Sequence, residues 1–156
     1  MPQTELICEL STSHGGEKAW QEKLIESAAI AGFDYAKFQS YEIRHLKTSD
    51  PQWFWMSQAE LSNADHNRLV KTCSSMGVSF LTTAFHKDRV HFLHDIGLHA
   101  VKVGSGEGGQ LDLLEEVAKY DWRIFVSTGL WTQAEMHDAL DILDGKDAVL
   151  LHTVSE

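Results

Sequence analysis

Short runs of β-type residues alternate with amphipathic helical segments along the whole chain. A strand followed by a helix and another strand forms a parallel β/α unit, because a parallel partner is reached only through a crossover connection. The sequence therefore predicts an α/β protein with about six strands and five helices. The runs lie at residues 5–10, 35–41, 78–85, 99–105, 123–129 and 148–154.

The intervening segments carry signals for helix boundaries. Ser62 and Thr132 are each followed three residues later by an acidic residue, Asp65 and Glu135, a pattern typical of a capping box. Glycines that can take the left-handed conformation follow four predicted helices, at Gly32, Gly77, Gly97 and Gly145. A buried stripe on the first helix is predicted at Trp20, Leu24, Ile25 and Ala28.

Residues 42–61 are expected to form a loop insertion after the second strand. The segment is rich in aromatic residues. Two interpretations stay open for it, a loop that faces a substrate or an excursion packed on the surface.

Composition restricts the class of protein. The 156 residues carry a formal net charge of −10, which disfavours a nucleic-acid surface with its clustered Lys and Arg. No apolar run approaches the ~20 residues of a membrane span, and residues 1–10 do not resemble a signal peptide. Cys8 and Cys73 form no C-x-x-C pair. These features predict a reduced, cytoplasmic protein.

Polar residues inside the predicted strands distinguish between two architectures, an open doubly wound sheet and a (β/α)8 barrel. In an open parallel sheet helices cover both faces, so the strands are nearly continuous apolar runs. Here lysines interrupt the runs "YAKFQ" and "AVKVG". Period-two alternation places a polar set on one face, near the carboxyl ends of the strands. The set comprises Glu9, Lys37, Thr83, Lys102, Ser127 and His152.

A buried ammonium group without a partner costs roughly several kcal/mol. Lys37 and Lys102 on an inner face therefore need anions or a wet cavity. A barrel offers both, because ligands bind at the carboxyl-terminal mouth of its interior. The lysines favour the barrel.

A G-x-G-x-x-G pattern occurs at Gly104, Gly106 and Gly109. A dinucleotide-binding loop follows an apolar strand, and an acidic residue ends the next strand. Here Lys102 lies in the preceding strand, and the next strand ends in Ser127. The glycines are better explained by a tight turn that brings backbone N–H groups near a phosphate. A nucleotide-binding doubly wound domain remains an alternative.

Seven short motifs, in order along nearly the whole chain, resemble the sialic acid synthase family, which includes N-acetylneuraminate synthase and the legionaminate, pseudaminate and spore-coat-polysaccharide relatives. They are "ICELSTSHGG", "AKFQ", "ELSNADHNRL", "VSFLTTAF", "VKVGSGE", "VSTG" and "LLHTVSE". The resemblance implies an aldolase-type TIM barrel with a small antifreeze-like domain at its carboxyl end. Residues 1–156 would supply strands 1 to 6 of that barrel.

The same resemblance implies a transferase of carbohydrate biosynthesis. Members condense phosphoenolpyruvate with an N-acetylated amino sugar such as N-acetylmannosamine and release phosphate. A divalent metal, Mn²⁺ or Mg²⁺, activates the sugar aldehyde, and the full-length form is compatible with a homodimer.

Carried over by position, the catalytic residues are Lys37 and Lys102, which would bind the phosphate and carboxylate of phosphoenolpyruvate. The hydroxyls of Thr83, Ser105 and Ser127 would hydrogen-bond the same anion. Ser155 lies where the family places a sugar-contacting polar residue, and Glu9 is expected to orient a lysine rather than to react. The alternative is that each lysine is structural and paired with a carboxylate such as Glu9.

The chain departs from the family at several positions. Gly15 stands where some members carry a Glu, and Ala84 and Thr153 replace the usual Pro and Cys, which leaves the acceptor sugar open. A complete barrel needs about 250 residues. The family's two metal-binding histidines and a substrate-binding arginine are expected beyond residue 156. The sequence therefore predicts a fragment or a truncated product, inactive alone, and a non-catalytic phosphate- or sugar-binding module is the alternative.

Histidines outside the motifs are ambiguous. His14 and His152 would lie near the barrel mouth, where each either contacts substrate or is a satisfied buried residue. His91 and His94 have a helical spacing that can hold a metal, but without a third ligand a solvated face is favoured.

Overall fold

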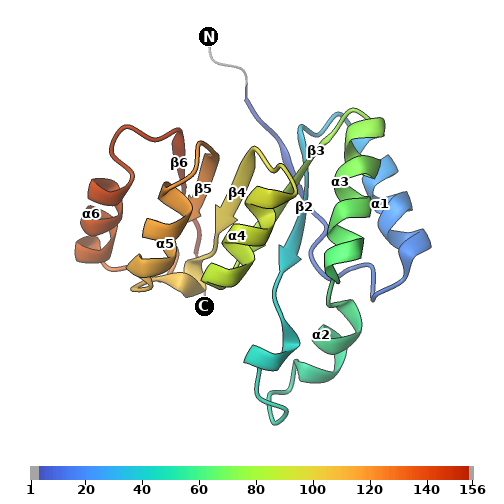
Figure 1. Ribbon diagram of the computed structural model, residues 1–156, viewed down its shortest axis with the longest axis horizontal. Helices are drawn as coiled ribbons and strands as arrows, with labels where there is room; N and C mark the ends of the chain where they lie inside the picture. Colours follow the sequence, from blue (N-terminus) through green and yellow to red (C-terminus); the bar gives the residue numbers. More distant parts are fainter. Residues whose placement is uncertain (1–3, 155–156) are drawn as a thin grey trace. The chain divides into compact units, whose positions relative to one another are not determined.

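The computed structural model describes residues 4–154 (Figure 1). The chain divides into two compact units, residues 1–81 and 82–156, and each is described by itself. The first unit contains β1 (Ile7–Glu9), α1 (Lys18–Ile30), β2 (Tyr35–Ser40), the 3₁₀ turn η1 (Ile43–His45), α2 (Trp53–Ala59), α3 (Asn63–Ser75) and the start of β3 (Ser79–Ala84).

The second unit contains the end of β3 and the elements that follow it. These are α4 (Lys87–Asp95), β4 (Ala100–Val103), the 3₁₀ turn η2 (Ser105–Glu107), α5 (Leu111–Ala118), β5 (Arg123–Ser127), α6 (Gln133–Ile142) and β6 (Ala148–Leu151). All six predicted strands are confirmed, and each lies within its predicted range.

In the first unit β1 and β2 run parallel, with Glu9 opposite Lys37. The backbone N–H of Ser79 donates to the carbonyl of Asp34 at 2.9 Å, so β3 begins beside the start of β2. The helices α1 and α3 lie side by side in Figure 1. Their buried residues Ile25 and Leu69 are fully excluded from solvent. Between β2 and β3 the rings of Phe38 and Phe80 stack, with their centres 5.5 Å apart.

The predicted stripe on α1 is only partly correct. Ile25 and Ala28 are buried, but Trp20 is 56% exposed. The buried row instead begins at Gln21, one residue later, and continues at intervals of four and three residues. Trp20 therefore lies at the edge of the buried face of α1. The ammonium of Lys23 lies 5.2 Å from the centre of its ring.

The insertion at residues 42–61 is more ordered than the sequence predicts. It holds η1 and the helix α2, so the described residues form six α-helices rather than five. No side chain caps the start of α2, which explains why no boundary signal was visible. The helix is anchored by the Tyr41 hydroxyl, which donates to the carbonyl of Met56 at 2.7 Å. Burial raises the pKa of Tyr41 to about 12, so the phenol keeps its proton.

In the second unit the strands follow in the order β3, β4, β5, β6, and each pair is parallel. The helices α4, α5 and α6 follow one another alongside these strands (Figure 1). Val101, Ile124 and Val126 are fully buried. Leu140 on α6 is 48% exposed, whereas Leu143 is buried. Among the described residues, no helix is both long and apolar enough to cross a membrane.

Both predicted capping boxes are confirmed. The side chain of Ser62 accepts from the backbone N–H of Asp65, and that of Thr132 accepts from Glu135 in the same way. The predicted glycines Gly32, Gly77, Gly97 and Gly145 all have positive φ.

His14 is a buried polar residue between the β1 loop and α1, only 2% exposed. Its Nδ1 accepts from the backbone N–H of Gly16 at 3.0 Å and lies 3.3 Å from the Gln21 amide nitrogen. Since a backbone N–H can only donate, Nδ1 is unprotonated and the neutral ring carries its proton on Nε2. Burial lowers the pKa of His14, partly opposed by Asp65.

Substitution of Ser62 by Ala is expected to lower the free energy of unfolding by about 1 kcal/mol, because an N–H at the start of α3 loses its acceptor. Denaturant unfolding measures the change. Ser74→Ala, at an exposed position of the same helix, is the control. Equal effects of the two substitutions would contradict a capping role.

The buried neutral His14 is expected to make stability depend on pH. Because its folded pKa is lowered, its contribution is fully present above the unfolded pKa of about 6.5 and is lost as pH falls through the folded pKa. His14→Gln is expected to flatten this dependence in unfolding curves measured across that range. His137→Gln, at an exposed site, serves as control and should leave the slope unchanged.

Candidate functional site

In the first unit, Lys37 and Glu9 form an ion pair. The register of β1 and β2 places the two residues opposite each other, and Lys37 Nζ lies 2.7 Å from Glu9 Oε2. The lysine side chain is 4% exposed and the glutamate side chain 53% exposed. A buried ammonium needs a partner, and Glu9 supplies it from the solvent side. The alternative that a lysine pairs with Glu9 therefore holds for Lys37, whereas a role of either residue in binding stays a prediction.

In the second unit, Thr83, Lys102 and Ser127 share one face of the sheet. Thr83 is in register with Lys102, and Lys102 with Phe125. Ser127 lies two residues after Phe125 in β5 and so points to the same side. The predicted common face is thus confirmed for these three residues.

The hydroxyls of Thr83 and Ser127 are unusual for buried groups. Each residue is 2% exposed, and neither hydroxyl has a hydrogen-bond partner among the described residues. Buried polar groups are normally bonded, and leaving one unsatisfied costs about 1–3 kcal/mol. Two such hydroxyls on the face that carries Lys102 are suited to a polar ligand.

His152 does not belong to this face. Leu151 is the residue in register with Ser127, and His152 follows β6 as an exposed residue. Its neighbour Thr153 was overlooked as a site residue in the sequence. The Oγ1 of Thr153 lies 2.9 Å from Oγ of Ser105. Its position two residues after Leu151 was the available signal, because alternate residues share a face.

Ser105 is held from several directions at the end of β4. Besides its bond to Thr153, its Oγ accepts from the backbone N–H of Gly129 at 3.2 Å. Its carbonyl accepts from the indole N–H of Trp131 at 3.0 Å. Hydrogen bonds of Ser105 therefore connect the segments that follow β4, β5 and β6.

The glycines of residues 104–109 serve different purposes. A side chain at Gly104 would collide with the carboxylate of Glu107, and Gly109 has a φ of +78°. The space where a side chain of residue 104 would lie is thus filled by the Glu107 carboxylate, and a role of the loop in phosphate binding stays a prediction. Glu107 is 8% exposed. It was also overlooked in the sequence, where a Glu in a glycine-rich loop gives no signal of burial.

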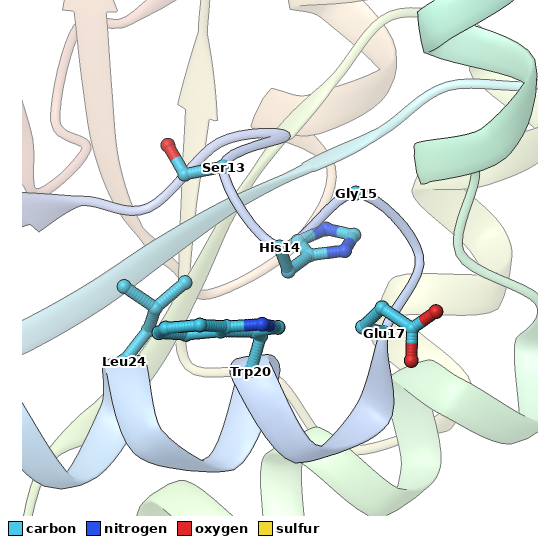
Figure 2. Close-up of a pocket in the computed structure, with 6 residues that line it drawn as sticks. All are labelled: Ser13, His14, Gly15, Glu17, Trp20 and Leu24. Atoms are coloured by element: carbon cyan, nitrogen blue, oxygen red, sulfur yellow. The ribbon is translucent and has the colours of Figure 1, made fainter.

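A surface pocket of about 400 Å³ lies at the start of α1 (Figure 2). Figure 2 shows Trp20 and Leu24 adjacent on the helix, with the imidazole of His14 above the indole. His14 thus lines the pocket while its ring nitrogens are buried in the loop. The lining comprises Ser13, His14, Gly15, Glu17, Trp20 and Leu24.

His91 and His94 of α4 interact with Tyr120, which follows α5. His91 Nδ1 lies 2.8 Å from the Tyr120 hydroxyl, and the ring of His94 lies 4.3 Å from that of Tyr120. His91 Nε2 also lies 3.5 Å from Glu116 Oε1.

Within either unit taken alone, the described part of the chain contains no group of three residues suited to hold a metal ion. The predicted site residue Ser155 lies outside the described residues.

The comparisons with known proteins agree with this architecture. The chain is 31% identical to N,N'-diacetyllegionaminic acid synthase of Campylobacter jejuni, over all of this chain and 53% of that protein. It is 25% identical to N-acetylneuraminate-9-phosphate synthase of Homo sapiens, over 88% of this chain and 42% of that protein. The chain thus spans about half the length of these relatives.

Solved structures show the fold. The N-acetylneuraminic acid synthetase of Leptospira borgpetersenii superposes with a TM-score of 0.94, at 24% identity, over 99% of this chain and 55% of that chain. The truncated 3-deoxy-D-arabino-heptulosonate 7-phosphate synthase of Thermotoga maritima superposes with a TM-score of 0.70, at 12% identity, over 97% and 53%. The predicted incomplete aldolase-type barrel is confirmed, and the open doubly wound sheet was wrong. The sequence profile of the NeuB family matches residues 24–156, and the chain therefore belongs to the NeuB family.

Proposed function

We propose that this chain is the amino-terminal part of the barrel of a sialic-acid-synthase-type transferase. The enzyme condenses phosphoenolpyruvate with an N-acetylated amino sugar such as N-acetylmannosamine and releases phosphate. One observation carries the proposal beyond family membership. It is the pair of buried, unsatisfied hydroxyls of Thr83 and Ser127 on the face of the sheet that carries Lys102.

This face has the chemistry of an anion site. An ammonium and two hydroxyls are all donors, and a charge-assisted bond is roughly twice as strong as a neutral one. The net charge of −10 opposes the approach of a trianionic or dianionic metabolite. A local cation such as Lys102 is therefore needed to attract it. We assign Thr83, Lys102, Ser105 and Ser127 to phosphoenolpyruvate, and Ser155 to the acceptor sugar.

Lys37 is proposed as a second cation for the same substrate. Its ammonium is already desolvated and is held by Glu9 through a single short contact. The opposite side of such an ammonium has further N–H donors, since a lysine carries three of them. In this proposal Glu9 fixes the position of Nζ and takes no part in the reaction.

The proposed chemistry joins the methylene carbon of phosphoenolpyruvate to the aldehyde carbon of the sugar, using the electron pair of the enol double bond. The aldehyde oxygen takes up a proton, water adds to C2 of the former phosphoenolpyruvate with loss of a proton, and phosphate leaves from C2 to give the 2-keto acid. Negative charge develops on the aldehyde oxygen as the bond forms, and preorganised cations stabilise such charge. The resemblance implies Mn²⁺ or Mg²⁺ to polarise that aldehyde. Among residues 4–154, neither unit alone provides a ligand set for such an ion. The ligands of the metal, the homodimer and the cytoplasmic location are therefore proposals about the whole protein.

A non-catalytic phosphate- or sugar-binding module is the second candidate. The unsatisfied hydroxyls would support anion binding in that case as well. Turnover distinguishes the two functions, because a module would bind phosphoenolpyruvate without releasing phosphate.

The complete product of the gene that encodes this sequence is expected to release phosphate from phosphoenolpyruvate in the presence of N-acetylmannosamine and Mn²⁺. Residues 1–156 alone should release none. Lys102→Ala should lower kcat/KM by about 10²–10³-fold, the loss typical of one preorganised donor to developing charge. Phosphate release measured continuously gives the rates.

Lys119→Ala is the matched control, because this lysine is 63% exposed and contacts Glu116 on α5. Phosphoenolpyruvate binding without any phosphate release would favour the module. An unchanged rate in Lys102→Ala would remove that lysine from the site.

Glu9→Gln tests whether the carboxylate positions Lys37. The substitution leaves the buried ammonium of Lys37 without its ionic partner. The free energy of unfolding is therefore expected to fall by about 1–3 kcal/mol. Calorimetric titration should also show weaker phosphoenolpyruvate binding. Glu26→Gln, at an exposed position of α1, is the control. Loss of stability with unchanged affinity would mean that the pair is purely structural.

A further inference from the structure

Trp131 is a large aromatic side chain buried in a loop. It lies between β5 and α6 and is 9% exposed, whereas its neighbour Leu130 is 59% exposed. The backbone N–H of Trp131 donates to the carbonyl of Thr128 at 3.1 Å, which closes a turn directly after β5. This turn directs the indole inward and Leu130 outward.

The indole contacts the Ser105 loop, defined here as residues 104–109. Its Nε1–H donates to the carbonyl of Ser105 at 3.0 Å. Its ring also covers Gly108 closely, because a Cβ built at Gly108 would lie 2.6 Å from Cδ1 of the indole. A residue with any side chain at Gly108 would displace the ring. The two contacts fix both ends of the 3₁₀ turn η2.

The hydroxyl of Ser105 is fixed at the same time. It accepts from the Gly129 N–H and lies 2.9 Å from the Thr153 hydroxyl. When Thr153 donates, Ser105 accepts both bonds and its own proton is left for an anion. Gly129 permits this approach, since a Cβ there would lie 2.6 Å from Oγ1 of Thr153.

We propose that Trp131 is a positioning residue, which holds the Ser105 loop in the conformation that binds the phosphoenolpyruvate anion. The proposal rests on the proposed role of Ser105 in binding that anion. A loop held in its bound conformation before the ligand arrives avoids the entropic cost of ordering. A reacting group misplaced by about 1 Å costs about 10²-fold in rate, so the position of this loop matters for turnover as well.

Trp131→Phe in the complete gene product tests the proposal, because phenylalanine keeps an aromatic ring over Gly108 and removes the N–H donor. The KM and the dissociation constant for phosphoenolpyruvate are expected to rise about five- to tenfold, the change that corresponds to one lost hydrogen bond. The melting temperature should fall by about a few degrees, as expected for the loss of one hydrogen bond. Gly108→Ala should produce the same shift, because its methyl group displaces the indole.

Hydrogen exchange of residues 104–109 supplies a readout that needs no substrate. Faster exchange of these amides is expected in Trp131→Phe and not in Leu130→Ala, a control in the same turn whose side chain points to solvent. Unchanged exchange in Trp131→Phe would overturn the proposal, whether or not phosphoenolpyruvate binds.

The binding data separate this proposal from the proposed function. If the unsubstituted protein fails to bind phosphoenolpyruvate, the proposed function is wrong, and exchange alone decides whether Trp131 holds the loop. If the unsubstituted protein binds and Trp131→Phe binds equally well, the positioning role is wrong and the proposed function stands. Faster exchange together with weaker binding supports both.

Discussion

The parallel register of the strands is the constraint on which the candidate site depends. One ladder places Thr83 beside Lys102, and the next carries the same face to Ser127. A shift by one residue would turn all of these polar groups toward the helices. The apolar residues between them, such as Val101 and Val126, are fully buried on the other side. The burial of that apolar face therefore keeps the polar face in place.

Local signals allowed most of the fold to be predicted. Strand positions follow from period-two alternation, and the starts of α3 and α6 follow from Ser62 and Thr132, because caps act within one turn of chain. Predictions were wrong where tertiary packing decides. Trp20 has helical spacing with the core, yet the α1–α3 contact turns it to the solvent. The helix α2 has no cap and is held by contacts such as that of Tyr41.

The candidate site was likewise predictable where local signals apply and not where tertiary contacts decide. Pairing of a lysine with Glu9 was left open as the structural alternative, because strand alternation places polar residues on one face but does not give the register that sets Glu9 opposite Lys37. The contacts of Ser105 were not foreseen, because they join residues 24 to 48 positions apart in irregular segments. His152 was placed on the wrong face and Thr153 was missed because the register that sets Leu151 opposite Ser127 cannot be determined from alternation within one strand. The burial of Glu107 likewise depends on the missing side chain of Gly104.

The close packing of Trp131 on Gly108 links two positions that lie far apart in the sequence. A bulky ring at one of them forbids a side chain at the other. In a homologue with a small residue in place of Trp131, position 108 no longer needs to be glycine. The two positions are therefore expected to be inherited as a pair, and in an alignment of the family their identities should covary.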